Sequence, residues 1–241
     1  MIYQMIEHFW NYPRFIRDFQ RFKSQKGDCR FNLKWSECYP CLLDRTSDTP
    51  FDRHYVFHTG WAARILSKTK PAEHIDISSS LYFASIASAF VPIKFYDYRP
   101  PNIKLTNLEV GFADLLSLPF PDSSLDSLSC MHVIEHVGLG RYGDPINPDA
   151  DLKAMAELKR VLAPHGNFLF VVPIGRAKVM FNAHRIYSYK QILAYYDDFK
   201  LMQFALIPDD VKTGGLIENA SEELADQQEY GCGCFWFRKE S

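Results

Sequence analysis

Short apolar runs alternate with amphipathic segments through most of the chain after residue 72. The first five runs predict strands at 73–78, 92–98, 108–116, 124–133 and 167–173. The amphipathic segments between them predict helices, the clearest at 80–90 and within 144–166. Nearly unbroken apolar runs such as NFLFVVP (167–173) are typical of strands that are covered on both faces. This alternation predicts an α/β fold whose parallel strands are joined by right-handed helical crossovers.

Two further apolar runs extend the pattern toward the last residues. LMQFALI (201–207) and CGCFWFR (232–238) predict strands, and a helix is expected around 189–196. We therefore expect a doubly wound, mostly parallel, seven-stranded sheet. Ligands in such sheets bind beyond the carboxyl ends of the strands.

The first 60 residues lack this alternation and form, on this interpretation, a helical and irregular extension or lid. The α/β domain is then expected to occupy residues 61–241. Residues 1–23 carry aromatic side chains at helical spacing among basic ones, with an interruption expected at Pro13. They predict a helix that packs on the main domain, or one that makes peripheral contact with a membrane or a lipid-linked substrate. Residues 36–60 are expected to be an irregular connection before a helix at 60–70.

Composition narrows the classes of function. A net charge of −2 over 241 residues provides no basic field for nucleic acid. No apolar run approaches the roughly 20 residues that span a bilayer, and the first residues do not resemble a signal peptide, so we expect a cytoplasmic protein. The six cysteines are expected to be reduced thiols. The alternative is a structural zinc site built from Cys38, Cys41, Cys232 and Cys234.

Acidic side chains follow three of the predicted strands. Asp76 lies in the first strand, Asp97 ends the second, and Asp114 follows the third. A carboxylate in the position of Asp97 can accept hydrogen bonds from both hydroxyls of an adenosine ribose. Asp114 lies about where an adenine amino group could be met. The alternatives are a solvated strand end for Asp97 and a simple aspartate turn for Asp114.

The order of these segments resembles a known family. HIDISSS, YDYRP, ADLLSLPFPDSSLDSLSCMHVIEHVG and LKRVLAPHGNFLFVVP together resemble the class I S-adenosylmethionine-dependent methyltransferases. The resemblance covers roughly residues 73–173. FDRHYVFHTGWAAR, GLGRYGDP and FNAHRIYSY further resemble a narrower group of methyltransferase-like proteins of unknown function, sometimes associated with glycan assembly.

The resemblance implies S-adenosylmethionine as the cofactor and methyl transfer to an oxygen or nitrogen of a small or glycan-type acceptor. The cofactor-binding residues that it implies are Asp76, Ser78, Ser80, Asp97, Tyr98, Asp114, Leu115, Met131 and His132. One departure is Ser78–Ser80, where the family usually has glycines that permit a tight turn. Either the turn differs, or the cofactor lies differently, or binding is lost. The missing glycines also leave open an alternative function, a non-catalytic binding module with the same fold.

Three residues are candidates for general-base catalysis, if the acceptor is a hydroxyl. His136 and Glu135 follow the fourth strand, and His184 follows the fifth. His136 is the first choice because a neutral imidazole titrates near working pH. The alternative for both histidines is a structural role.

His132, Glu135 and His136 also spell H-x-x-E-H, a signature of inverted zinc peptidases. A zinc peptidase is the less favoured alternative, because a strand precedes the motif and glycines follow it at Gly138 and Gly140. We therefore expect no metal at this motif. His54 and His58, four residues apart, are expected to pack structurally or to form a wall of the ligand pocket.

Overall fold

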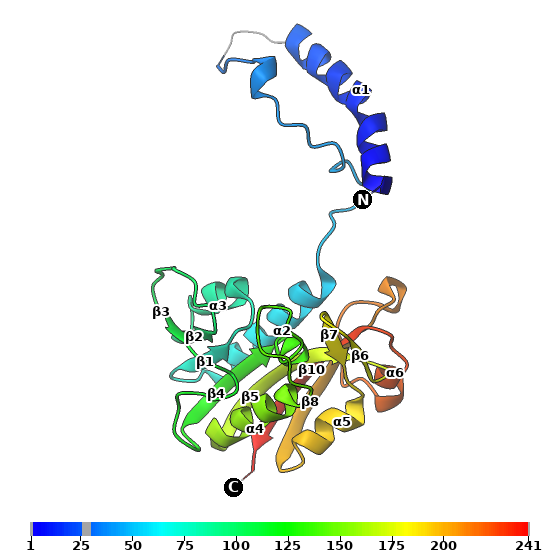
Figure 1. The fold of residues 1–241 in the computed structure, drawn as a ribbon. Helices are drawn as coiled ribbons and strands as arrows, with labels where there is room; N and C mark the ends of the chain where they lie inside the picture. The colour runs from blue at the N-terminus through cyan, green and yellow to red at the C-terminus, as the bar shows by residue number, and fades with distance from the viewer. Residues whose placement is uncertain (1, 26–29, 241) are drawn as a thin grey trace. The chain divides into compact units, whose positions relative to one another are not determined.

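The structure, a computed structural model, describes residues 2–25 and 30–240, with side chains from residue 10 onward. It divides into two compact units, Met1–Phe51 and Asp52–Ser241 (Figure 1). The sequence-based division at residue 60 falls inside a helix of the second unit, α2 (Arg53–Thr69). Along the described chain, no helix combines the length and apolar character that a membrane crossing requires.

The N-terminal unit contains a long helix, α1 (Ile2–Ser24), and a short 3-10 turn, η1 (Trp35–Glu37). The prediction that Pro13 interrupts the helix is wrong, because Pro13 lies inside α1. A proline removes only one backbone donor, and the turns on either side keep their own hydrogen bonds. Trp35 packs on Phe15 and Phe19, with ring centroids 5.8 and 4.9 Å away.

The second unit is built on an eight-stranded sheet with the order β3-β2-β1-β4-β5-β10-β8-β9. The strands are β1 (His74–Ile77), β2 (Ile93–Asp97), β3 (Leu108–Phe112), β4 (Leu125–Met131), β5 (Leu162–Ile174), β8 (Phe199–Ile207), β9 (Ile217–Glu218) and β10 (Gly231–Lys239). The first five strands of the chain pair in parallel, whereas β10 runs antiparallel to both β5 and β8. The strand order reverses between β1 and β4, which is where a doubly wound sheet places its ligand site.

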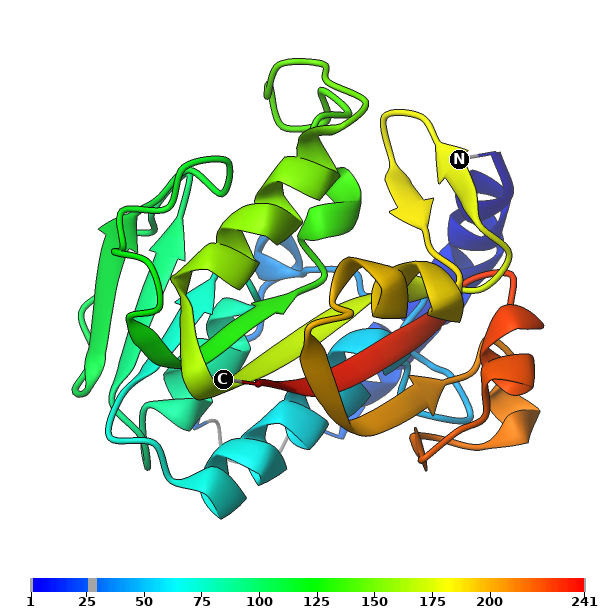
Figure 2. The same ribbon diagram turned by 90° about the horizontal axis from the view of Figure 1, so that it is seen from below.

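Helices cover both faces of this sheet (Figure 2). One face carries α2 and α3 (Leu81–Ala87), and the other carries α4 (Ala150–Val161) and α5 (Tyr189–Tyr195). Alternate side chains of β5 pack into the cores on the two faces of the sheet. Phe168 and Phe170 pack in the core with α4 and α5, whereas Leu169 and Val171 pack in the core with α2 and α3. The predicted α/β, doubly wound, mostly parallel fold is confirmed.

Three local predictions differ from the structure. The segment FDRHYVFH is helical rather than irregular, because Asp52 caps α2 by accepting the Tyr55 N–H at 3.1 Å. The sheet gains an eighth strand, β9, whose two residues are too short to show a period. A separate hairpin, β6 (Lys178–Met180) with β7 (His184–Ile186), follows β5. The remaining short elements are η2 (Ile134–His136), η3 (Val211–Thr213) and α6 (Glu222–Asp226).

Candidate functional site

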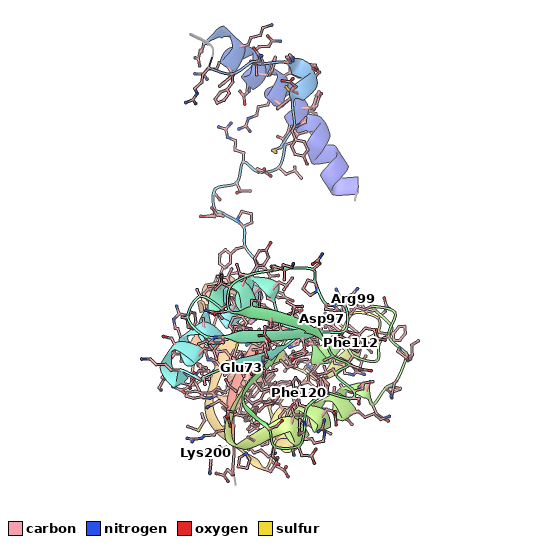
Figure 3. All side chains as sticks on the ribbon, turned by 90° about the vertical axis from the view of Figure 1, so that its left-hand side faces the viewer. Glu73, Asp97, Arg99, Phe112, Phe120 and Lys200 are labelled. Carbon is pink, nitrogen blue, oxygen red and sulfur yellow. The ribbon has the colours of Figure 1, made fainter. Side chains whose placement is uncertain are left out.

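A pocket of about 800 Å³ opens at the carboxyl ends of β1 and β2. Its walls come from three segments: the start of α2, the turn between β1 and α3, and the loop that follows β2. The polar groups among its walls include Asp52, Ser79, Ser80, Asp97 and Arg99. Figure 3 shows Asp97 and Arg99 where β2 ends, away from Glu73, which directly precedes β1. The pocket therefore lies at the carboxyl ends of the parallel strands, on the β2 side of the switch point between β1 and β4.

A buried carboxylate holds the turn between β1 and α3. Asp76 is fully buried, accepts the Ser79 N–H at 3.0 Å and also accepts the Ser129 hydroxyl. Burial raises the pKa of Asp76 to about 6, although the hydrogen bonds from Ser129 and Ser79 act in the opposite direction. The Ser79 hydroxyl in turn accepts the Met131 N–H at 3.0 Å, which links the turn to the end of β4. Asp76 thus acts on the pocket by fixing its wall.

Ser78 keeps the backbone conformation that a glycine would adopt at this turn. Its φ is 56°, in the left-handed region that costs a non-glycine residue roughly 1–2 kcal/mol. The Ser78 N–H and hydroxyl both donate to the Tyr96 carbonyl, at 2.7 and 3.3 Å. These hydrogen bonds offset part of the strain. The tight turn is therefore retained without glycine, which speaks against the first alternative, a turn of different conformation.

Asp76 makes the stability of the protein depend on pH. Because its pKa in the folded state lies above the ordinary value of 3.8, the folded state holds the proton more tightly than the unfolded state. The contribution of Asp76 to the free energy of unfolding should be largest at acidic pH and fall by about 3 kcal/mol as pH rises from below 4 to above 6. Urea titrations of wild type and Asp76→Asn from pH 4 to 7 should show their stability difference shifting by that amount. A difference independent of pH would contradict a raised pKa.

Asp97 is half-buried at the end of β2, and its Oδ1 accepts the Arg99 N–H at 2.7 Å. The hydrogen bond fixes the carboxylate against its own loop while the side chain lines the pocket. Beside it, the exposed rings of Tyr98 and Phe112 lie 5.6 Å apart at the ends of β2 and β3. A carboxylate next to exposed aromatic rings suits a ligand that has both hydroxyls and a planar ring.

Other predicted cofactor-binding residues lie outside the pocket walls. Asp114 is half-buried and its Oδ1 accepts the Leu116 N–H at 2.9 Å, which is the aspartate turn considered as its alternative. Leu115 is 8% exposed and packs in the core that includes α4. Met131 is 1% exposed and packs in the core that includes α2. Ser80, by contrast, lines the pocket as the residue that precedes α3.

A cluster of imidazoles lies beyond the end of β4 and brings distant segments together. His54 and His58 come from α2, and the His132 ring lies 5.3 and 5.1 Å from theirs, centroid to centroid. His132 Nδ1 is 2.8 Å from Glu135 Oε1, and both side chains are buried. Burial is the main cause that lowers the pKa of His54, to about 4, and it lowers that of His58 well below its ordinary value. These two imidazoles are therefore neutral at neutral pH.

The three predicted catalytic residues lie close to one another. His136 Nε2 is 3.8 Å from Glu135 Oε1, and the His136 and His184 rings are 6.4 Å apart. His136 Nδ1 donates to the Ala183 carbonyl at 2.6 Å, which leaves Nε2 as the acceptor nitrogen. Burial lowers the pKa of His184. The structure thus places the candidate bases together, next to the histidine cluster.

Residues 119–204 match the family model described as Caenorhabditis protein of unknown function, DUF268. A 1,6-didemethyltoxoflavin-N1-methyltransferase from Burkholderia thailandensis, solved with its substrate and S-adenosylhomocysteine, superposes with a TM-score of 0.54. It is 13% identical, and the match covers 80% of this chain and 93% of that one. The N-methyltransferase NodS from Bradyrhizobium japonicum, solved with S-adenosylhomocysteine, superposes with a TM-score of 0.53. It is 15% identical, and the match covers 81% and 90% of the two chains. No curated protein sequence matches this chain.

The chain has the class I methyltransferase fold. Its resemblance to these S-adenosylmethionine-dependent enzymes, inferred from the sequence motifs, is confirmed at the level of fold.

Two tyrosines near this site were not among the candidate site residues expected from the sequence. The Tyr230 ring lies 4.7 Å from that of His184 and 5.1 Å from that of His54, centroid to centroid. The Tyr142 ring centroid lies 4.9 Å from the Arg99 guanidinium and 5.1 Å from the Arg141 guanidinium. Both tyrosines lie in segments without periodicity, so only the folded structure places them at the site.

Proposed function

We propose that the chain binds S-adenosylmethionine in the pocket at the ends of β1 and β2. Asp97 carries this proposal, because its carboxylate lines the pocket at the strand end where the ribose hydroxyls would be accepted. The turn at Ser78–Ser80 would face the methionine part, with Asp76 fixing that turn from below. Tyr98 would cover the adenine, and Asp114 with Leu115 would meet its edge after a local adjustment.

The proposed reaction is methyl transfer to an oxygen or nitrogen of a small or glycan-type acceptor. Transfer requires the nucleophile, the methyl carbon and the leaving sulfur to lie in line, which is chiefly a problem of positioning. An acceptor hydroxyl also has to lose a proton, and His136 is the proposed base, with His184 as the second candidate. The Nε2 acceptor nitrogen of His136 supports this assignment. A cytoplasmic location also remains a prediction.

A second candidate function is binding without catalysis. Its support is the strained, glycine-free turn at Ser78, which departs from the pattern expected of the catalytic family. Cofactor binding is common to both functions, and only turnover separates them. The zinc peptidase is not proposed, since the one group of metal-binding side chain types that converges among the described residues contains His132 but not His136.

Isothermal titration of wild-type protein with S-adenosylhomocysteine tests the cofactor assignment. We expect one site with a Kd in the micromolar range, comparable with most enzyme–substrate affinities. NAD⁺ is the control, because it contains the same adenosine group but carries a pyrophosphate and nicotinamide riboside in place of the homocysteine. Absence of both heat and thermal stabilisation with S-adenosylhomocysteine would exclude the proposed function.

A further inference from the structure

Three side chains of types that can bind a metal converge from different segments near the pocket. His54 lies in the first turn of α2, His132 directly follows β4, and Cys232 lies at the start of β10. One ligand atom from each lies within 4.8 Å of those of the other two. Among the described residues, this is the only such group of histidine, cysteine and carboxylate side chains.

His132 is oriented as a metal-bound histidine usually is. Its Nδ1 faces Glu135 Oε1 at 2.8 Å, so this nitrogen carries the proton and Nε2 carries the lone pair. His132 is 8% exposed, and its Nε2 is buried without a hydrogen-bond partner among the described residues. A buried nitrogen without a hydrogen-bond partner is costly. The backbone of His132 is also strained, because its φ is 58°. Both features are typical of a functional site.

The spacing of the rings also agrees with shared coordination. Two imidazoles bound to one tetrahedral ion, through bonds of about 2.0–2.1 Å, bring their ring centroids to about 5 Å. The His54 and His132 centroids are 5.3 Å apart. His58, one helical turn after His54, is held by its Nδ1 against the His54 carbonyl at 2.6 Å. The His58 Nε2 is also buried and unpartnered, so a second lone pair lies beside the first.

We propose that His54, His132 and Cys232 bind one divalent transition-metal ion of the zinc type. Two imidazoles and one thiolate favour such an ion over magnesium or calcium, which take oxygen ligands. Three protein ligands leave the fourth position for water or for an oxygen of a bound molecule, as in catalytic zinc sites. On binding, the Cys232 S–H bond is replaced by a sulfur–metal bond, and the proton passes to the buffer.

This assignment uses the H-x-x-E-H motif differently from a peptidase. His132 is a ligand, Glu135 is its hydrogen-bond partner, and His136 takes no part. It replaces our sequence-based expectation that the motif holds no metal. It also differs from the four-thiolate alternative, because only Cys232 of those four cysteines is a ligand. Cys38 and Cys41 belong to the N-terminal unit. The proposal does not depend on S-adenosylmethionine binding.

The test is zinc binding by untagged protein that has first been stripped with a chelator. Titration calorimetry should give one ion per chain, and cobalt substitution should produce a sulfur-to-cobalt charge-transfer absorption. His54→Ala and His132→Ala should each weaken binding by about 100-fold or more, and Cys232→Ser should abolish the absorption. Glu135→Gln should weaken binding by about 10- to 100-fold. His136→Ala, from the same motif, should bind as tightly as wild type.

The proposal is wrong if stripped wild-type protein binds no zinc or cobalt. Buried water would then be the hydrogen-bond partner of the imidazole nitrogens. It is equally wrong if binding survives His54→Ala and Cys232→Ser but is lost in His136→Ala or in the double variant Cys38→Ser/Cys41→Ser. Near-ultraviolet circular dichroism establishes that each variant is folded. His54 is only partly buried, so His54→Ala decides the question if the His132 variant does not fold.

Discussion

Replacing Asp97 with alanine is expected to weaken binding of S-adenosylhomocysteine by about tenfold or more. A carboxylate that accepts two ribose hydroxyls makes charge-assisted hydrogen bonds, each worth roughly 1.5–3 kcal/mol, and about 1.4 kcal/mol corresponds to one factor of ten. Alanine also removes the acceptor that holds the Arg99 N–H, so the loop after β2 loses an anchor. Titration calorimetry of the wild type and the variant measures the effect directly.

Two further variants separate the charge of Asp97 from its role in the loop. Asp97→Asn keeps an oxygen for the Arg99 N–H but removes the negative charge, so binding should be weakened less than in the alanine variant. Glu109→Ala removes an exposed carboxylate from the neighbouring strand, outside the pocket walls, and should bind as wild type does. If all three variants match wild type, the ribose does not lie on Asp97 and the cofactor pocket must be assigned elsewhere.

The fold could be predicted because its determinants repeat locally along the chain. In NFLFVVP, alternate side chains such as Phe170 and Val171 belong to the cores on opposite faces, which requires an apolar residue at nearly every position. The start of α2 escaped prediction because its signal is one residue, Asp52, among many turn-forming residues. Strand β9 escaped because pairing with β8, rather than any pattern in its two residues, makes it a strand.

Some residues of the candidate site could likewise be predicted from the sequence, and others could not. Asp97 could be placed because the end of a parallel strand has a known position relative to the ligand. The group of His54, His132 and Cys232 could not, because these residues are far apart in the sequence. They meet only once α2, the end of β4 and the start of β10 are packed together. Local sequence also left open whether Ser78 could form the turn. The answer depends on Tyr96, a residue of the neighbouring strand.

His136→Ala is expected to lower methyl transfer by about 100-fold or more while leaving affinity for S-adenosylhomocysteine nearly unchanged. The reason is the loss of a base positioned by the Ala183 carbonyl with its Nε2 lone pair available. The acceptor for this assay comes from incubating wild-type protein with methyl-labelled cofactor and a panel of sugars and small alcohols and amines. His184→Ala is compared on the same acceptor, and the base is the histidine whose loss lowers turnover without affecting cofactor affinity.

His136→Asn distinguishes catalysis from a structural role at the same position. The asparagine amide can still donate to the Ala183 carbonyl, so it can hold the β6–β7 segment, but it has no basic nitrogen in place of Nε2. If His136 is the base, the asparagine variant should be as slow as the alanine variant. Recovery of turnover in His136→Asn would instead assign His136 to positioning. Full turnover in both the His136→Ala and His184→Ala variants would exclude either histidine as the base. Orientation of the acceptor against the methyl group would then have to account for the reaction.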